Sequence, residues 1–400
     1  MKFLVLNNDY RAFLDWLYQT NEGLETRPYE EQLRVRIESS FGLADFYSYN
    51  LMKIGQEAYD LFVNNEYAQT AWAKEHSLRV PESKTTHLVN TLQKKRNRAA
   101  NTRLRLLKPL LNPFLRVLDQ KGRKSLESSF YEILSAQVQR IKPDVLINLT
   151  METVTGSFLK EVKPFVKWIV GQHAAPLPQE NDFGAYDLIL SSLPNQVAFF
   201  RSMGVKTEPL RLGFEPRILN RLTRTGTEHP VSFVGTISSD HETRMDLLES
   251  LCRQSLVLSL WGNMVKRVPD NSPLRKCYKG TAWGMAMYQI LHDSRITLNH
   301  HIGVSNAFAN NMRLYEATGV GTLLLTDWKQ NLPEIFEPGK EVVVYSNREE
   351  CLETVQYYLE HEEERKSIAS SGQKRTLRDH TYGQRMKEFL AILKSHFAVS

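Results

Sequence analysis

The chain has 400 residues and a mass of 46.2 kDa, which is enough for two domains of ordinary size. Hydrophobic residues make up 42% of it and charged residues 24%, and this balance excludes both a broadly disordered chain and a short disulfide-held scaffold. The formal net charge is +6, but residues 94–124 carry eleven Lys or Arg against one Asp, so that segment holds +10 and the rest −4. The positive charge is therefore one local patch.

The cysteines and the absence of long apolar segments indicate the compartment. Cys252, Cys277 and Cys351 are an odd number at wide spacing, which forms neither a disulfide framework nor a CxxC metal motif. The first residues contain too short an apolar run for a signal peptide, and no stretch of ~18–20 apolar residues predicts a membrane span. These features predict a cytoplasmic protein.

Ten short apolar runs alternate with helix-like stretches. They are KFLVLN (2–7), AYDLFV (58–63), DVLINL (144–149), FVKWIV (165–170), DLILSS (187–192), VSFVG (231–235), LVLSLWG (256–262), RITLN (295–299), TLLLTD (322–327) and EVVVY (341–345). Such runs, separated by helices, are typical of buried parallel strands in βαβ units. We expect an α/β fold with two open sheets of five strands each and a domain boundary near residue 210, where the chain has no clear helical period.

Two further segments are expected to be helical. Residues 84–124 form a basic insertion whose apolar positions follow helical spacing, although Pro109 and Pro113 must bend or divide it. Thr381 to Phe397 predict a last amphipathic helix with one apolar side, formed by Met386, Phe389, Leu390 and Leu393.

The strand VSFV ends at Gly235 and Thr236 and leads into the next helix. Ser239-Asp240-His241-Glu242 has the form of a capping box, and Arg244 follows in the first turn. A helix start offers free backbone N–H groups, so this connection can cradle a phosphate beside a fixed cation. Any α/β unit also needs a connection of this kind for purely structural reasons.

A second helix start is predicted in Asn310-Asn311-Met312-Arg313, with Asn as the N-cap and a glycine as the stop. Glu316 can accept two hydrogen bonds from a ribose diol, while Arg313 and the backbone N–H groups can meet a pyrophosphate. The alternative is a surface pair between Arg313 and Glu316, worth only ~0.2–0.5 kcal/mol.

Polar residues also follow two other strands of the second half. Trp261 and Asn263 end one strand, and Asn299 and His300 end the next, at the edge where open α/β sheets bind ligands. These residues can contact a nucleotide. Alternatively, Trp261 can pack in the core and His300 can have a purely structural role in its loop. His300 and His301 point opposite ways in extended chain, so no metal site is assigned.

In the first half, three polar residues end strands and can reach a cleft between the domains. His173 can polarise a group or handle a proton, and Glu152 or Asp9 can act as a base. A single loop histidine can equally be structural.

The segments VSFVG, SLWGN, SRITLNHH, NNMRLYEATGVGTLLLTDW and NLPEIFEPGKEVVVYSN resemble two-domain glycosyltransferases of the GT-B fold, most closely the CgeB-like group with a group 1 type donor domain. KPDVLINL, IVGQHAAPLP and YDLILSSLPNQVAFFRSMGV look like the first domain of that group, so the resemblance spans nearly all of the chain except residues 90–130. It implies two Rossmann-like domains facing each other across a cleft: an acceptor-side domain (1–210), a donor-binding domain (211–381) and a helix that crosses back (382–400).

The resemblance implies a hexosyltransferase-type enzyme that moves a sugar from a nucleotide diphosphate sugar to a glycan, lipid-linked or protein acceptor, as in polysaccharide biosynthesis. By position, Glu316 matches the ribose-binding carboxylate, Gly235 and Thr236 the phosphate-facing turn, Arg244 a basic position near the diphosphate, and residues 310–313 the helix start. The resemblance implies retention of the sugar configuration. Related retaining enzymes often carry a glutamate eight positions earlier, where this chain has Phe308, so the donor sugar is left open.

A leaving diphosphate can be stabilised by helix N-termini and arginine, and the sequence has no DxD pair. We therefore expect no metal and no cofactor beyond the nucleotide sugar.

The patch at 94–124 has three interpretations. It can lie on anionic lipid on the inner face of a membrane, where each cation adds ~1 kcal/mol, form a solvated face or an oligomer contact, or bind an acidic polymer. Two other classes of function stay open: a nucleic-acid-binding protein that uses this patch, and a sugar-nucleotide-binding protein without catalysis. The first is disfavoured, because the patch offers only Phe114 for base stacking.

Overall fold

The structure is a computed structural model that describes residues 1–78, 130–177, 182–223, 225–236, 242–254, 258–263, 268–269, 271–305 and 307–397. The predicted basic insertion (84–124), the patch at 94–124, His241 and most of the predicted capping box lie outside the described residues.

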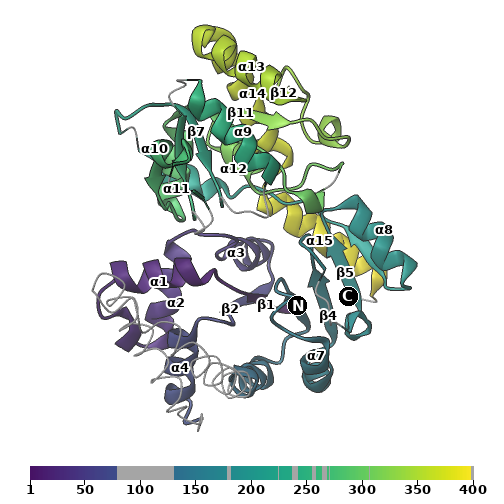
Figure 1. Ribbon diagram of the computed structural model, residues 1–400. Coiled ribbons are helices and arrows are strands. Elements are labelled where there is room, and N and C mark those ends of the chain that lie inside the picture. The colour runs from purple at the N-terminus through teal and green to yellow at the C-terminus, as the bar shows by residue number, and fades with distance from the viewer. Residues whose placement is uncertain are drawn as a thin grey trace, which may run out of the picture.

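Two parallel six-stranded sheets stand one above the other, each with helices around it (Figure 1). The first sheet has the order β2-β1-β3-β4-β5-β6 and the second the order β12-β11-β10-β7-β8-β9. The strands of the first sheet are β1 (Lys2–Asn7), β2 (Glu57–Phe62), β3 (Val145–Asn148), β4 (Trp168–Gln172), β5 (Leu188–Ser191) and β6 (Thr207–Pro209). Those of the second are β7 (His229–Val234), β8 (Leu258–Trp261), β9 (Tyr278–Gly280), β10 (Ser294–Asn299), β11 (Leu323–Asp327) and β12 (Val343–Tyr345).

The structure corrects the expected strand number from five to six in each sheet. The two additional strands, β6 and β9, are edge strands of three residues, too short and too polar to produce an apolar run. The strand expected at 165–170 begins only at Trp168, because Lys163–Phe165 forms a 3-10 turn around Pro164.

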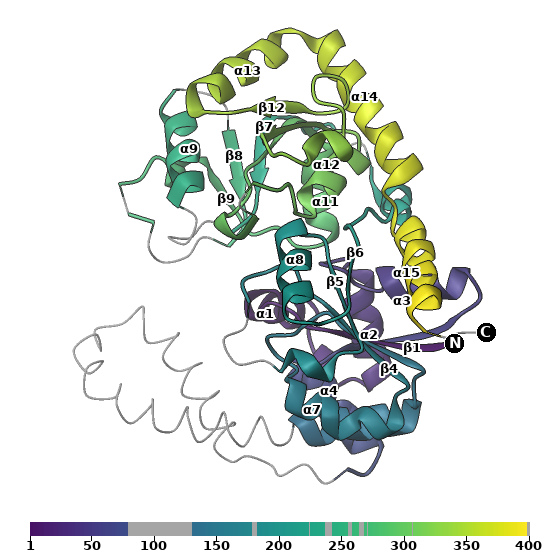
Figure 2. The same cartoon turned by 90° about the vertical axis from the view of Figure 1, so that its right-hand side faces the viewer.

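Helices connect the strands and cover both faces of the sheets (Figure 2). In β1, Phe3 and Val5 belong to one buried cluster while Leu4 and Leu6 belong to another, which is why the strand lacks polar alternation. The longer helices of the first half are α1 (Arg11–Thr20), α2 (Tyr29–Glu38), α3 (Phe46–Lys53), α4 (Glu66–Glu75), α7 (Gly156–Val162) and α8 (Pro194–Ser202). The second half has α9 (Glu242–Arg253), α10 (Leu274–Cys277), α11 (Met285–His292), α12 (Arg313–Gly319), α13 (Arg348–Glu360), α14 (Glu362–Asp379) and α15 (Tyr382–His396).

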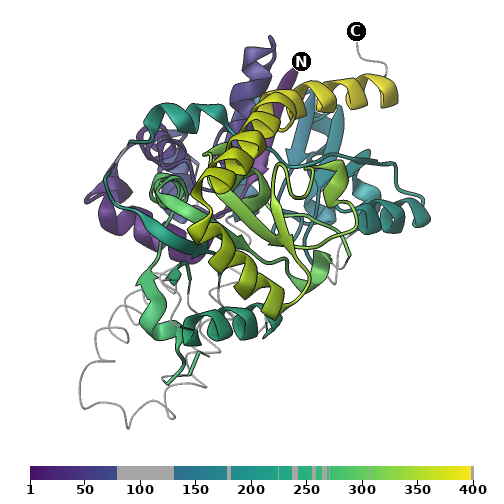
Figure 3. The same ribbon diagram turned by 90° about the horizontal axis from the view of Figure 1, so that it is seen from above.

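The last helix lies against the first half of the chain. From above, α14 and α15 form a continuous yellow band that runs from the second sheet to the first (Figure 3). Met386, Phe389 and Leu393 are buried, and the Phe389 ring lies 6.1 Å from that of Phe3 in β1. The apolar side predicted for this helix is therefore the side that packs on the first sheet.

A second contact joins the two halves near α11. Trp283 is buried among Phe13 and neighbouring apolar side chains of the first half, and its ring stands edge-on to Phe41 at 5.0 Å. Gly284 has φ +53°, and a Cβ there would lie 1.8 Å from the Ser39 carbonyl oxygen. Only glycine fits at this crossing, which brings the carboxyl-end edges of the two sheets toward each other.

Candidate functional site

The order of strands in each sheet marks one position where ligands are expected. In the second sheet the chain turns from β7 to β8 on one side and returns to β10 on the other, so the strand order reverses between β7 and β10. In the first sheet the reversal lies between β1 and β3. The carboxyl ends of strands at such a reversal border a crevice, where open α/β sheets bind their ligands.

Arg244 bridges the reversal in the second sheet. Its Nη1 donates to the Thr236 carbonyl at 3.0 Å, just beyond β7, and its Nη2 donates to the His300 carbonyl at 2.7 Å, just beyond β10. The residue is 9% exposed, and burial lowers its pKa to about 10, so it remains a cation at neutral pH.

The charge of Arg244 is only partly offset, because the Asp327 carboxylate at the end of β11 acts on it electrostatically without pairing with it. Among the described residues no carboxylate forms an ion pair with Arg244, and its Nε has no hydrogen-bond partner. A buried cation without a direct ion pair is costly, so this edge of the sheet can gain from a bound anion.

Two glycines make the adjoining turn compact. Gly262, at the end of β8, has φ +137°, and a Cβ there would lie 1.9 Å from the Gly235 carbonyl oxygen. Gly235 N–H donates to the Trp261 carbonyl at 2.9 Å. The predicted glycine turn thus exists as a backbone-to-backbone contact between the ends of β7 and β8, which a side chain at position 262 would prevent.

Arg313 and Glu316 form the predicted i,i+3 pair, but the pair is buried. Nη1 of Arg313 lies 2.9 Å from Oε2 of Glu316, and their side chains are 13% and 7% exposed. Nη2 of Arg313 donates to the Val234 carbonyl at 3.0 Å, so the pair adjoins the end of β7. Burial raises the pKa of Glu316 against the opposing effect of Arg313. The small energy of an exposed helical pair therefore does not apply here.

The helix start differs from the expectation. The helix begins at Arg313 with Met312 as N-cap, which makes no side-chain cap, and Asn310 takes no part. The Asn311 side chain instead accepts from Leu314 N–H at 3.2 Å and donates to Asn299 Oδ1 at 2.8 Å. Asn311 therefore ties α12 to the end of β10.

The other strand-end residues divide into buried and exposed ones. Asn299 is buried and donates to Thr326, and His300 Nδ1 lies 2.9 Å from the Tyr345 hydroxyl. The Trp261 ring packs 4.8 Å from that of His229, the first residue of β7, so it extends back over the sheet rather than into the crevice. Asn263 is exposed beyond β8.

In the first sheet, two of the three predicted residues lie together. Nδ1 of His173 is 3.9 Å from Oε1 of Glu152, and the side chains are 2% and 47% exposed. The His173 Nε2 is 3.2 Å from the Pro176 carbonyl, which can only accept, so Nε2 carries the proton. Nδ1 faces the Glu152 carboxylate and is an acceptor when the ring is neutral.

Asp9, the third candidate, is occupied by Arg36. Nε and Nη2 of Arg36 donate to the two Asp9 carboxylate oxygens at 2.7 and 2.5 Å, and the carboxylate is fully buried. Arg36 also lies over the Phe62 ring at 4.1 Å. With both oxygens engaged, Asp9 is part of the scaffold and not a base that faces the cleft.

Sequence reasoning missed a pair at the same edge of the second sheet. His301, which the spacing argument set aside, places Nδ1 2.7 Å from Asp327 Oδ1 at the end of β11, and Lys329 lies 3.3 Å from the other oxygen. Burial acts to raise the pKa of Asp327, but the hydrogen bond and charge of His301 outweigh it and hold that pKa well below its usual range. The signal was available, because Asp327 ends the strand that neighbours β10.

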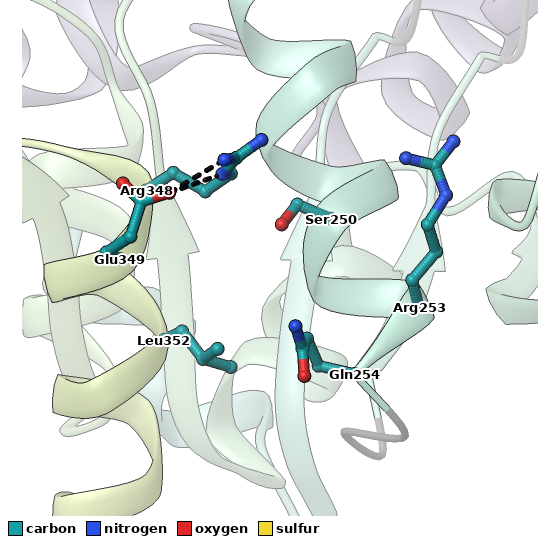
Figure 4. Close-up of a pocket in the computed structure, with 6 residues that line it drawn as sticks. All are labelled: Ser250, Arg253, Gln254, Arg348, Glu349 and Leu352. Atoms are coloured by element: carbon teal, nitrogen blue, oxygen red, sulfur yellow. Dashed lines mark hydrogen bonds and ion pairs between the residues drawn. The ribbon is translucent and has the colours of Figure 1, made fainter.

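Other features of the described residues do not add to this site. A cavity of about 260 Å³ between α9 and α13 is lined by Ser250, Arg253, Gln254, Arg348, Glu349 and Leu352, none of which is a strand-end residue (Figure 4).

Within the described residues, no three His, Cys, Asp or Glu side chains gather as metal ligands would. None of the described helices has both the length and the apolar composition that a bilayer span requires.

A sequence match to a known family lies in the second half of the chain. Residues 244–391 match the family model described as "Glycosyl transferase-like", which covers less than half of the chain. This region runs from Arg244 to α15 and includes Arg313 and Glu316. The search of curated proteins gives no match.

Solved structures match over nearly the whole length, at low identity. Anabaena HepE in complex with UDP and glucose has a TM-score of 0.55 at 12% identity, covering 99% of this chain and 100% of that one. A glycosyltransferase from Rickettsia africae has a TM-score of 0.55 at 10% identity, covering 100% and 99%. The N-terminal domain of Candida albicans trehalose-6-phosphate phosphatase has a TM-score of 0.50 at 9% identity, covering 99% and 97%. The two-sheet arrangement is therefore the GT-B fold, and because differently named proteins share it, the site must decide the activity.

Proposed function

We propose that this protein is a glycosyltransferase that takes a sugar from a nucleoside diphosphate sugar held by the second sheet and its helices. The observation that carries the proposal is the pair of buried arginines at the β7–β10 reversal, beside a buried glutamate. Arg244 has no ion-pair partner among the described residues, and Glu316 meets Arg313 through one oxygen and the Tyr288 hydroxyl, at 3.5 Å, through the other. A diphosphate would neutralise the cation, and a ribose diol would give the carboxylate closer donors than that long contact with Tyr288.

The glycosyl transferase-like match of residues 244–391 supports the proposal. HepE, whose structure contains UDP and glucose, shares the fold, and a UDP-sugar is the first donor to test. In this arrangement the first domain (1–210) binds the acceptor, the second (211–381) binds the donor, and the last segment (382–400) joins them.

Catalysis follows from charge placement. As the bond between the sugar and the phosphate breaks, negative charge grows on the diphosphate, and Arg244 and Arg313 can stabilise it without reorganisation. His173 and Glu152 lie together at the ends of β4 and β3, and in this proposal they meet the acceptor hydroxyl, which must lose its proton. We propose that the reaction needs no metal ion and retains the configuration of the sugar. Activity that persists in excess chelator supports the first point, and loss that Mg²⁺ or Mn²⁺ restores contradicts it.

The test of the donor site is a thermal-shift screen of UDP, GDP, ADP and CMP, with their common sugars, on the wild type and Glu316→Gln. A ligand at a hundred times its Kd raises the free energy of unfolding by about 2.7 kcal/mol. We expect one nucleotide family to stabilise the wild type and to lose most of that effect in Glu316→Gln. The matched control is Glu334→Gln, because Glu334 also pairs with an arginine, Arg211, but is exposed.

Three outcomes separate the alternatives. A nucleotide shift with sugar transfer to an acceptor supports the transferase, and a shift without turnover of the donor indicates a binding protein. No shift with any nucleotide, together with a strong salt-dependent interaction with RNA, would favour the nucleic-acid interpretation of residues 94–124. Binding to anionic vesicles at low salt tests whether the same residues hold the enzyme on a membrane.

A further inference from the structure

The reversal between β1 and β3 brings together side chains that the donor site does not use. Asn8 and Tyr10 follow β1, and Glu152 follows β3; Asn8 Nδ2 donates to the Thr153 hydroxyl at 3.2 Å, which ties the two loops together. His173 follows β4, the next strand in the sheet, and faces Glu152. Three neighbouring loops therefore border one position in the first sheet, at the edge where a ligand is expected.

Tyr10 presents an aromatic ring to solvent at this edge. The residue is 67% exposed, and its ring meets the edge of the Phe41 ring at 5.9 Å. Its hydroxyl is nevertheless desolvated by the surrounding protein, which, together with the nearby Glu152 carboxylate, raises its pKa. The Tyr10 ring is therefore open to a ligand at the edge where the loops after β1 and β3 meet.

The backbone that carries Tyr10 is held rigidly. Asp9, the preceding residue, is fixed by the bidentate Arg36 pair. Its N–H donates to Asn64 Oδ1 at 2.8 Å, and its carbonyl accepts from Asn64 Nδ2 at 2.7 Å. A ring held open on a fixed backbone needs little ordering when a ligand stacks on it.

Glu152 and His173 complement that ring. His173 Nδ1 and Glu152 Oε1 lie 3.9 Å apart, and a hydroxyl oxygen within hydrogen-bond distance of both can donate its one proton to the carboxylate or to the Nδ1 of a neutral ring. A carboxylate repels a phosphate and gains nothing from an acyl chain, whereas it accepts hydroxyl donors well. An apolar ring face next to hydroxyl acceptors matches a pyranose, which has an apolar C–H face and hydroxyls around its rim.

We propose that the acceptor is a saccharide whose terminal pyranose stacks on Tyr10 and places one hydroxyl between Glu152 and His173. The proposal rests on the proposed function and names the class of acceptor for that site. Tyr10 binds the saccharide in this proposal. The hydroxyl between Glu152 and His173 is the one that those two residues can deprotonate.

The experiment is saturation-transfer difference NMR with methyl glycosides of glucose, galactose, mannose and N-acetylglucosamine, each alone and with UDP. We expect ring C–H protons of at least one glycoside to receive saturation from the wild type, Tyr10→Phe and Tyr10→Trp. Tyr10→Ala should weaken binding about five- to tenfold, because stacking is lost while the fold is kept. Tyr59→Ala is the matched control, since Tyr59 is also an exposed tyrosine beside a carboxylate, Glu57, but lies in β2.

Three results would overturn the proposal, and the first two are no contact of any glycoside with the wild type and equal binding by Tyr10→Ala. Transfer to a lipid carrier without a sugar headgroup, with no glycoside contact, would also overturn it while the proposed function stands. Conversely, glycoside binding that depends on Tyr10 in a protein without any nucleotide shift would keep the saccharide site and remove the transferase.

Discussion

Two buried arginine–carboxylate pairs lie at the carboxyl-end edges of the two sheets, and they differ in how completely they are formed. Arg36 reaches both oxygens of Asp9, so the carboxylate is fully engaged; three phenylalanine rings surround the guanidinium, whose Nη1 has no hydrogen-bond partner among the described residues. Arg313 meets one oxygen of Glu316 and the Val234 carbonyl, and its Nε has no partner among the described residues. A completed pair fixes the backbone beside it, whereas an incomplete pair can still gain a ligand without losing an existing bond.

Breaking the completed pair should have the largest effect. Arg36→Met leaves the Asp9 carboxylate buried without a counter-charge, and we expect a loss of about 3–5 kcal/mol in the free energy of unfolding, measured in urea. The double variant Arg36→Met/Asp9→Leu should recover most of that loss, because no uncompensated charge then remains. A loss below about 1 kcal/mol for the single variant would contradict the assignment of Asp9 to the scaffold.

Asp60 shows what happens to a buried carboxylate that no arginine contacts. Burial raises its pKa to about 7, against the hydrogen bond from Ser48. Because the folded-state pKa lies above that of the unfolded chain, the stability contribution is complete below about pH 4 and is lost as the pH rises to about 7. Asp60→Asn should reduce the decline of stability across this window, by on the order of 2–4 kcal/mol, in urea unfolding at stepped pH. An unchanged pH profile would show that Asp60 is ionised in the folded protein.

Arg244→Lys tests whether the donor edge needs a bridging guanidinium or only a positive charge. Lysine keeps the charge but lacks the planar fork with which Arg244 holds the Thr236 and His300 carbonyls together. We expect about tenfold weaker UDP binding by calorimetry, which corresponds to ~1.4 kcal/mol. Equal affinity in Arg244→Lys would mean that charge alone is sufficient there.

The smallest effect is expected for an exposed pair of the same chemistry. Arg211 and Glu334 lie 2.8 Å apart with side chains 38% and 66% exposed. Arg211→Ala should change the free energy of unfolding by less than about 1 kcal/mol, because water and salt screen the pair. A larger effect would indicate that this contact holds the first residues of the second domain (211–381) against the rest of that domain.

The sequence predicted most of the sheets because buried parallel strands form continuous apolar runs, and KFLVLN became β1 with the predicted bounds. It missed β6 and β9, which have three residues each and are extended because they pair with a neighbouring strand, β5 and β8 respectively. It located Glu316 and Arg313 at a helix start, but it could not tell an exposed pair from a buried one, since burial depends on β7 and α11. Asp9 illustrates the same limit, because Arg36 lies 27 residues away in the chain.

The sequence by itself determined the class of fold, the strand-end positions of the polar residues and the local basic patch, because hydrophobic periodicity and composition are local properties. Only the tertiary structure decided which of those residues share a site. Strand order placed the ends of β7 and β10 side by side under Arg244, and the ends of β1 and β3 beside each other at Tyr10 and Glu152. The hydrogen-bond partners, the burial and the ion pairs of each site residue depend on contacts between segments far apart in the chain. A local sequence pattern cannot predict those contacts.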